Sequence, residues 1–282
     1  MPMKFGVAIF PTDQSIGVGE LVREVEDRGF ESFWVPEHTH IPVSRRSPYP
    51  GGTDLPEYYK RTFDPFVALT VAAESSSRLL LGFGIVLMVE RDPITTAKAV
   101  ASLDFVSGGR VIFGVGGGWN LEEMENHGTD PKLRWRLLKE RVLAMREIWT
   151  REEAEFHGER VDFDPIWSWP KPVQDPLPVY VGGNTENTLK RVIAYGDGWI
   201  PNAGRSRLVA QVPVFRRLCE ESGRGHLPVT VYGTRPTAEA IADYEALGVD
   251  RLVFWVPSRP RDEVLRELEA VTNLVGDRLL TA

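Results

Sequence analysis

Short runs of hydrophobic residues alternate with amphipathic stretches along the whole chain. The runs are rich in Val, Ile, Phe and Leu with little polar alternation, which is typical of parallel strands covered on both faces. They predict strands at residues 4–10, 32–36, 79–87, 110–115, 178–181, 198–201, 229–232 and 251–256. Helical spacing of apolar residues predicts helices at 17–28, 64–76, 94–106, 133–149, 185–195, 207–221, 237–247 and 262–274.

Eight strands and eight helices in strict alternation predict an α/β fold, a (β/α)₈ or TIM barrel. A doubly wound open sheet is the competing arrangement. The sequence contains no internal repeat, low-complexity tract or shift in composition that would mark a second domain. We therefore expect residues 1–282 to form a single domain.

Two connections, residues 37–63 and 151–177, are longer than a plain barrel needs and are rich in Pro and aromatic residues. Connections of this length in a compact domain commonly serve as lids or binding loops. We interpret them as insertion loops after strands 2 and 4, both on the carboxyl face where barrel active sites lie. The second is expected to contain a small hairpin around residues 155–163.

Charge and composition narrow the class of partner. The net charge of −7 argues against sequence-independent binding to nucleic acid, which requires clustered Lys and Arg. No apolar run is long enough to span a membrane, and the chain enters its first strand without a signal peptide. These features predict a cytoplasmic protein whose partner is a small-molecule substrate, with neither nucleic acid nor membrane.

The residues at the strand ends exclude several kinds of chemistry. No Lys stands at a strand end for a Schiff base, and no G-x-S-x-G nucleophile motif occurs. His38 and His40 have the spacing of a metal-binding pair, but the other three histidines fall in loops or at the opposite face. We therefore predict no metal site.

Glycines dominate the ends of two strands. In the run Gly114-Val115-Gly116-Gly117-Gly118, Trp119 replaces the third glycine of a dinucleotide-binding fingerprint. Bare backbone beside aromatic residues suits a flat, redox-active heteroaromatic ring. A second run, residues 182–185, opens a helix; it is either a phosphate site at the helix N-terminus or a tight turn with an N-cap.

His38 follows the second strand and has two interpretations. Its imidazole is suited to general acid–base chemistry near neutral pH, or it is hydrogen-bonded to hold the long loop. Glu37 would orient or tune His38, or bind the cofactor. Trp167 and Trp169 form either an aromatic wall over the substrate or a structural cluster in the hairpin.

Five segments, residues 30–42, 78–124, 153–174, 178–191 and 196–202, together resemble the luciferase-like monooxygenase superfamily, and more closely its branch of coenzyme F420-dependent oxidoreductases. The resemblance implies a cofactor ring across the carboxyl ends of the strands. It also implies a bulge, often with a non-prolyl cis peptide, at Gly84-Ile85, and a catalytic histidine at His38. Related sugar dehydrogenases carry Asp where this chain has Glu37 and Glu where it has Trp119, which argues against a sugar-phosphate substrate.

We therefore predict an oxidoreductase that transfers a hydride between F420 and a small organic substrate, and that forms a homodimer as its relatives do. The alternatives are an FMN-dependent monooxygenase of the same superfamily, a non-catalytic flavin- or deazaflavin-binding barrel, and a non-redox phosphate-binding barrel. The predicted catalytic residues are His38 and Glu37, and the predicted substrate-binding residues are His40, Trp167 and Trp169. The predicted cofactor-binding residues are Phe10, Gly84, Ile85, Gly116, Gly117, Gly118, Trp119, Gly182, Gly183, Asn184 and Thr185.

Overall fold

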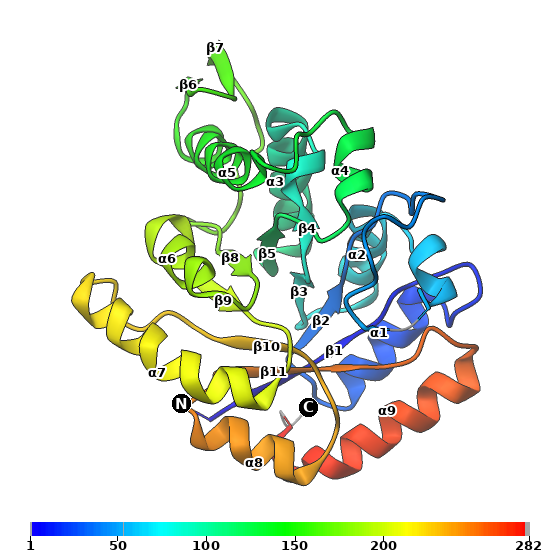
Figure 1. The fold of residues 1–282 in the computed structure, drawn as a ribbon. Coiled ribbons are helices and arrows are strands. Elements are labelled where there is room, and N and C mark those ends of the chain that lie inside the picture. Colours follow the sequence, from blue (N-terminus) through cyan, green and yellow to red (C-terminus); the bar gives the residue numbers. More distant parts are fainter. Residues whose placement is uncertain (1, 53, 280–282) are drawn as a thin grey trace.

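The computed structural model describes residues 2–52 and 54–279 and contains the predicted barrel (Figure 1). All of the strand pairs in the barrel are parallel, in the order β10-β11-β1-β2-β3-β5-β8-β9, and two isolated bridges join β9 to the β10 side. The barrel strands are β1 (Lys4–Ala8), β2 (Ser32–Val35), β3 (Leu80–Phe83), β5 (Val111–Gly116), β8 (Val179–Gly182), β9 (Gly198–Ile200), β10 (Thr230–Thr234) and β11 (Arg251–Trp255).

One long helix follows each barrel strand and lies on the outside (Figure 1). These helices are α1 (Val18–Asp27), α2 (Pro65–Ser75), α3 (Pro93–Ser107), α5 (Arg134–Thr150), α6 (Glu186–Tyr195), α7 (Arg205–Glu221), α8 (Ala238–Ala246) and α9 (Arg261–Val275). Every predicted strand and helix is confirmed, with boundaries shifted by a few residues. Asp64 caps α2, as expected for an Asp-Pro helix start, by accepting hydrogen bonds from the N–H groups of Phe66 and Val67.

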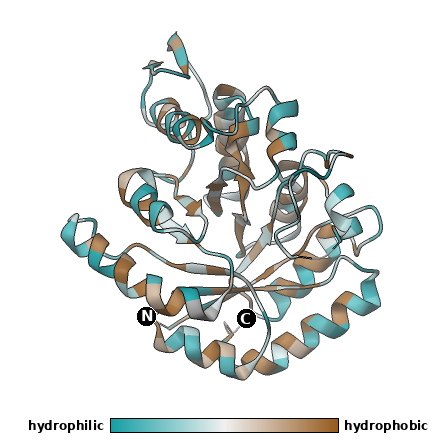
Figure 2. Cartoon of the chain, in the orientation of Figure 1, coloured by the Kyte–Doolittle hydropathy of each residue, from teal (hydrophilic) through white to brown (hydrophobic). Residues whose placement is uncertain are grey.

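Hydrophobic side chains form two cores. Figure 2 shows hydrophobic residues along β1 and β11, whereas outer helices such as α9 carry both polar and apolar residues. The larger core lies between helices and strands, and a smaller one around Trp34 fills the barrel interior. A Cβ at Gly82 would lie 2.1 Å from the Trp34 ring, so glycine makes room for the indole. Among the described residues, no helix is long and apolar enough to cross a membrane.

The amino end of the barrel is closed by a buried ion pair. Arg251, the first residue of β11, donates from Nε and Nη2 to the two carboxylate oxygens of Glu31, both at 2.6 Å. Such bidentate pairing compensates the cost of burying both charges. Trp34 and Tyr180 pack next to this pair and fill the amino half of the barrel interior. The open space therefore lies at the carboxyl end.

The two insertions start at opposite ends of the barrel. The first, residues 37–63, contains η1 (Glu57–Lys60) and contributes to the carboxyl-side cavity, as predicted. The second was placed wrongly: it follows α5, not a strand, and so starts at the amino side. It forms the predicted hairpin of β6 (Ala154–His157) and β7 (Asp162–Ile166), and Gln174 beyond it donates to the carbonyl of Val111 at the start of β5.

Four short helical elements were not predicted because their apolar patterns span too few residues. They are η1, α4 (Leu121–Asn126), η2 (Met88–Glu90) and η3 (Gly276–Arg278). A further strand, β4 (Val86–Leu87), continues the third barrel strand beyond an interruption and pairs with β5. The elements β4, η2 and α4 carry much of the site described below.

Candidate active site

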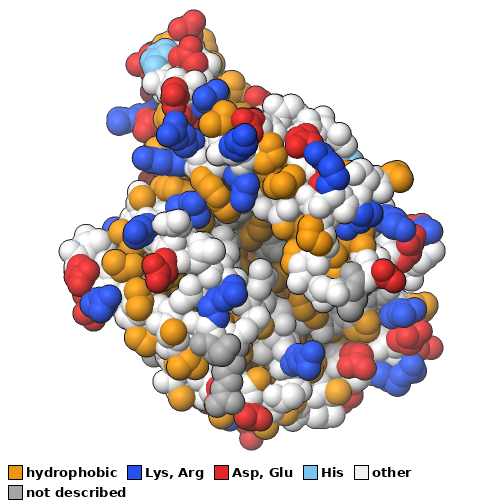
Figure 3. Space-filling model, viewed as in Figure 1, with side chains coloured by type: hydrophobic (Ala, Val, Ile, Leu, Met, Phe, Trp, Pro, Cys, Tyr) orange, Lys and Arg blue, Asp and Glu red, His pale blue; other side chains and the backbone are white. Residues whose placement is uncertain are grey.

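A cavity of about 480 Å³ opens at the carboxyl ends of the strands, and Figure 3 shows the molecule hollowed there. Most of the predicted site residues line it. Those that do are Phe10, Glu37, His38, Gly84, Ile85, Gly116, Gly117, Gly118, Trp119, Gly182 and Gly183. The cavity therefore lies at the end of the barrel, and at the strand ends, where the sequence predicts the site.

The floor of the cavity is formed where the third strand is interrupted. The peptide bond between Gly84 and Ile85 is cis, so the predicted bulge is confirmed. A Cβ at Gly116 would lie 2.6 Å from Ile85 Cδ1, and one at Gly182 would lie 3.0 Å from Ile85 Cγ2. These glycines thus make room for the Ile85 side chain, and the floor is an apolar side chain framed by bare backbone rather than bare backbone alone.

Aromatic side chains form the walls. Trp135 of α5 covers Gly117, whose Cβ would lie 2.7 Å from the indole. Tyr232 of β10 packs against Gly84, and its hydroxyl group is buried without a hydrogen-bond partner among the described residues. Burial raises the pKa of Tyr232 well above its usual value, so the hydroxyl keeps its proton and can donate it to a ligand. The remaining aromatic walls are Phe10, Tyr49, Tyr59, Trp119 and Trp255.

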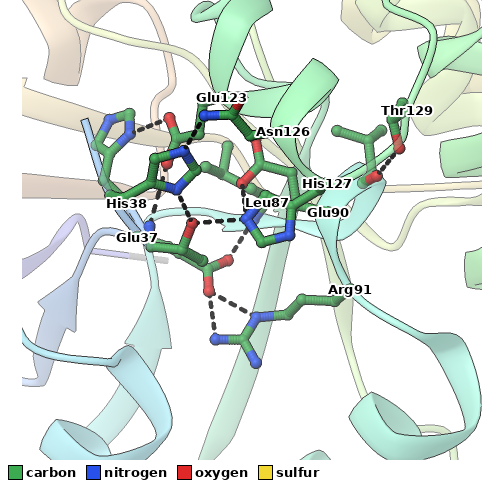
Figure 4. A network of polar contacts seen from close by, with 12 residues as sticks. Glu37, His38, Leu87, Glu90, Arg91, Glu123, Asn126, His127 and Thr129 are labelled. Atoms are coloured by element: carbon green, nitrogen blue, oxygen red, sulfur yellow. Dashed lines mark hydrogen bonds and ion pairs between the residues drawn. The ribbon is translucent and has the colours of Figure 1, made fainter. Parts of the chain in front are cut away.

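His38 is held by a carboxylate from a distant part of the chain (Figure 4). Its Nδ1 lies 2.7 Å from Glu123 Oε2, and the other oxygen of Glu123 accepts from the N–H of Thr39 at 3.1 Å. Both side chains of the pair are buried, at 6% and 1% exposure. A carboxylate only accepts, so Nδ1 carries the hydrogen, and Nε2 has no hydrogen-bond partner among the described residues.

Glu37 does not contact His38 through a hydrogen bond; its carboxylate faces the other way (Figure 4). It accepts from the N–H of Leu87 and from Nε of Arg91, both at 2.6 Å. Burial raises the pKa of Glu37, although the Arg91 guanidinium acts in the opposite direction. Glu37 thus holds β4 and the segment after it, whereas Glu123 positions His38.

Sequence reasoning missed Glu123, which lies on the short helix α4. A signal was present: Asn120 and Glu123 have the spacing of a helix N-cap and its third residue, and Asn120 Oδ1 accepts from the N–H of Glu123. That spacing predicts a helix start after the fourth barrel strand. It does not reveal which way the Glu123 side chain points.

Five predicted site residues do not line the cavity. Asn184 bridges β8 to the end of β9 by accepting from and donating to the main chain of Asn202, and Thr185 is the N-cap of α6. His40 is hydrogen-bonded to the Thr39 hydroxyl. Trp167 and Trp169 are 73% and 58% exposed, and the connection that carries them follows a helix and not, as predicted, a strand.

Similarity to known proteins assigns this chain to a family. The family model for the luciferase-like monooxygenase matches residues 3–268. The chain belongs to this family. An uncharacterised protein of Mycobacterium tuberculosis is 40% identical over 272 residues, covering 95% of this chain and 96% of that protein.

Two further proteins that are similar to this chain have names that state a cofactor or a reaction class. The F420-dependent glucose-6-phosphate dehydrogenase of Kineococcus radiotolerans is 27% identical, over 91% of this chain and 73% of that protein. The crystal structure of the monooxygenase RslO1 from Streptomyces bottropensis has a TM-score of 0.81 at 20% identity and covers 98% of both chains. The second likeness establishes the fold alone.

The role of Glu123 in this luciferase-like protein can be tested with Glu123→Gln. The two donors, Thr39 N–H and His38 Nδ1–H, contact different oxygens of Glu123, and an amide offers an oxygen at only one of these two positions. We expect the amide oxygen to stay on Thr39, the NH₂ to donate to Nδ1, and the imidazole hydrogen to move to Nε2. Nitrogen-15 spectra of the histidine side chains report the tautomer directly. A variant that keeps Nδ1–H would show that Glu123 does not set the tautomer of His38.

Among the described residues, no group of three or more His, Cys, Asp and Glu side chains is placed to hold a metal ion.

Proposed function

We propose that this chain is an F420-dependent oxidoreductase that transfers a hydride between the deazaflavin and a small organic substrate. The observation that carries the proposal is His38, which lines an apolar, glycine-framed cavity, has no hydrogen-bond partner on Nε2 among the described residues, and is held at Nδ1 by a buried carboxylate. Membership of the luciferase-like family and the F420-dependent relative support it.

The residues present fit a flat ring. Ile85 and the glycines around it form a floor on which a planar heteroaromatic group can lie, and the unpartnered hydroxyl of Tyr232 offers a donor to a polar ring edge. When bound, a deazaflavin supplies a carbon that accepts or donates a hydride. This chain's own contribution is to hold the ring, exclude water and manage one proton.

His38 would exchange that proton at Nε2 with the oxygen of an alcohol or carbonyl substrate. Trp119 lies beside it, with the two ring centroids 5.8 Å apart and nearly perpendicular. Among the described residues that line the cavity there is neither Lys nor Arg, and the one carboxylate, Glu37, is occupied by Arg91. The lining thus favours an uncharged apolar or aromatic substrate over a sugar phosphate.

An FMN-dependent monooxygenase is the second candidate, favoured by the likeness to the monooxygenase RslO1. The same floor and walls suit either ring, so the choice between the cofactors depends on measurement. A barrel that binds the cofactor without turnover is the third candidate, and the ordered His38–Glu123 pair argues against it because binding alone does not require a positioned imidazole.

Titration of the purified protein with F420 and with FMN, followed by fluorescence, tests the proposal. We expect F420 to bind with micromolar affinity or better and FMN to bind at least tenfold more weakly. Tight binding of FMN with no response to F420 would contradict the proposal and favour the monooxygenase.

A further inference from the structure

Two arginines lie against the indole of Trp135 at the edge of the cavity. The guanidinium carbon of Arg191, on α6, is 3.8 Å from the centroid of the ring, and that of Arg134, on α5, is 5.0 Å away. Trp135 itself lines the cavity above Gly117. Two positive charges are therefore concentrated on one aromatic side chain beside the proposed cofactor site.

Neither guanidinium is neutralised by the described part of the protein, where no carboxylate lies within ion-pair distance of Arg134 or Arg191. Arg134 donates from Nη1 to the carbonyl of Pro131 at 2.9 Å, and its Nε is buried without a partner. Burial lowers the pKa of Arg191, and the charge of Arg134 lowers it further. Bringing two like charges together in this way is unfavourable unless an anion joins them.

Two other arginines on or next to α5 are paired with carboxylates. Arg146, further along α5, donates to Asp197 at 2.7 Å. Arg151, at the end of α5, lies 3.3 Å from Glu147. Arg134, Arg141 and Arg191 lack such carboxylate partners among the described residues, and of these three Arg134 and Arg191 lie against Trp135, whereas Arg141 donates to the carbonyl of Met88. Figure 3 shows Lys and Arg side chains gathered over α5 and α6, on one side of the hollow.

The position of this pair relates it to the cavity rather than to the outer surface. Trp135 and Gly183 both line the cavity, and α6, which carries Arg191, begins three residues after Gly183. A ligand whose ring occupies the cavity and whose chain leaves it between α5 and α6 would pass these guanidinium groups. The planar guanidinium is well suited to bind phosphate and carboxylate oxygens in pairs.

We propose that Arg134 and Arg191 bind the anionic chain that the cofactor carries outside the ring cavity, a chain bearing phosphate and carboxylate groups. This inference rests on the proposed function, because F420 carries a phosphodiester followed by glutamyl carboxylates. The arginines then contribute to affinity and to the choice of cofactor, since a chain with several negative charges neutralises both guanidinium groups, whereas a single phosphate is a smaller counter-charge.

The test compares two compounds with the same ring: F420, and the deazaflavin that lacks the phosphate and glutamyl chain. We expect wild-type protein to bind F420 at least tenfold more tightly. Arg191→Ala and Arg134→Ala should each weaken F420 binding about tenfold, the loss of one charge-assisted contact. Neither substitution should change the affinity for the chain-less ring, and both should reduce the salt dependence of F420 binding.

Arg151→Ala is the matched control, because it removes the same charge from the far end of α5, where Arg151 is 69% exposed. We expect it to leave both affinities unchanged. Equal losses for the two compounds in Arg134→Ala and Arg191→Ala would show that the arginines only hold Trp135 in place, and would overturn the proposal. Wild-type protein that binds the two compounds equally would overturn it as well, while leaving the proposed function intact.

The comparison of FMN with riboflavin separates this inference from the choice of cofactor. If the protein ignores F420 but binds FMN more tightly than riboflavin, and the two arginine variants abolish that difference, the anion site stands and the F420 assignment fails. If the variants leave the difference between FMN and riboflavin unchanged, the anion site is wrong as well.

Discussion

Replacing His38 by alanine is expected to lower hydride-transfer turnover by about 10²- to 10⁴-fold, the usual contribution of a positioned acid–base group. The dissociation constant of the cofactor should change by no more than about twofold, because the ring would contact Ile85 and the aromatic walls rather than the imidazole. The measurement is the rate of deazaflavin reduction or oxidation in a single turnover, followed by absorbance.

The control for this experiment is His157→Ala on β6, which removes a histidine whose side chain is 56% exposed and lies in the hairpin, outside the cavity lining. It should retain the wild-type rate. A His38→Ala variant with the wild-type rate and the wild-type affinity would remove His38 from the mechanism and leave the cavity as a binding site alone.

Replacing Glu90 by glutamine is expected to stabilise the fold progressively as the pH rises. The Glu90 side chain is 1% exposed, and neither carboxylate oxygen has a hydrogen-bond partner among the described residues. Burial raises the pKa of Glu90 to about 9, and the nearby charges of Glu123 and Glu37 contribute to the rise, while Arg91 opposes them. His127 lies 3.7 Å away, too far for a strong hydrogen bond (Figure 4).

The direction of this pH effect on stability follows from the number of protons that the folded and unfolded states bind. Between the ordinary carboxyl pKa and about 9, the folded protein keeps a proton on Glu90 that the unfolded chain releases. Wild-type stability therefore falls with rising pH in this range, by up to about 1.4 kcal/mol per pH unit from this group. The amide of the glutamine variant cannot ionise, so the variant escapes that loss.

Urea unfolding of both proteins at pH 5 and pH 8 measures the effect. The difference in unfolding free energy between Glu90→Gln and wild type should be near its minimum at pH 5 and clearly in favour of the variant at pH 8. Equal differences at the two pH values would mean that Glu90 is ionised in the folded protein and has a partner that compensates its charge.

The barrel was predictable because strand-like and helix-like segments alternate repeatedly along the chain. Each apolar run and each amphipathic stretch is weak alone, but their alternation admits few folds, and helix starts such as Asp64-Pro65 add local support. The single predicted strand at residues 79–87 is in fact β3 and β4 with the cis peptide at Gly84-Ile85 between them. Hydrophobic pattern cannot detect that interruption; the family resemblance did.

The site was predictable at the level of strand ends but not of side-chain direction. Glu37 is next to His38 in sequence, yet consecutive residues point to different sides, and the partner of His38 is Glu123 on another segment. The expectation that the loop carrying Trp167 and Trp169 follows a strand was wrong, since this loop follows a helix and so begins at the amino end of the barrel. Aromatic composition alone carries no information about which end a loop occupies.

The ion pair of Arg251 and Glu31 that closes the amino end of the barrel has a kinetic consequence. With the interior filled from below, the cavity has its opening at the carboxyl side. If the proposed cofactor ring lies against Ile85, it occupies the innermost position, and a substrate bound outside it would block the way in and out. The proposed function therefore implies a compulsory order of binding, in which the cofactor enters first and leaves last, and excess substrate slows its exchange.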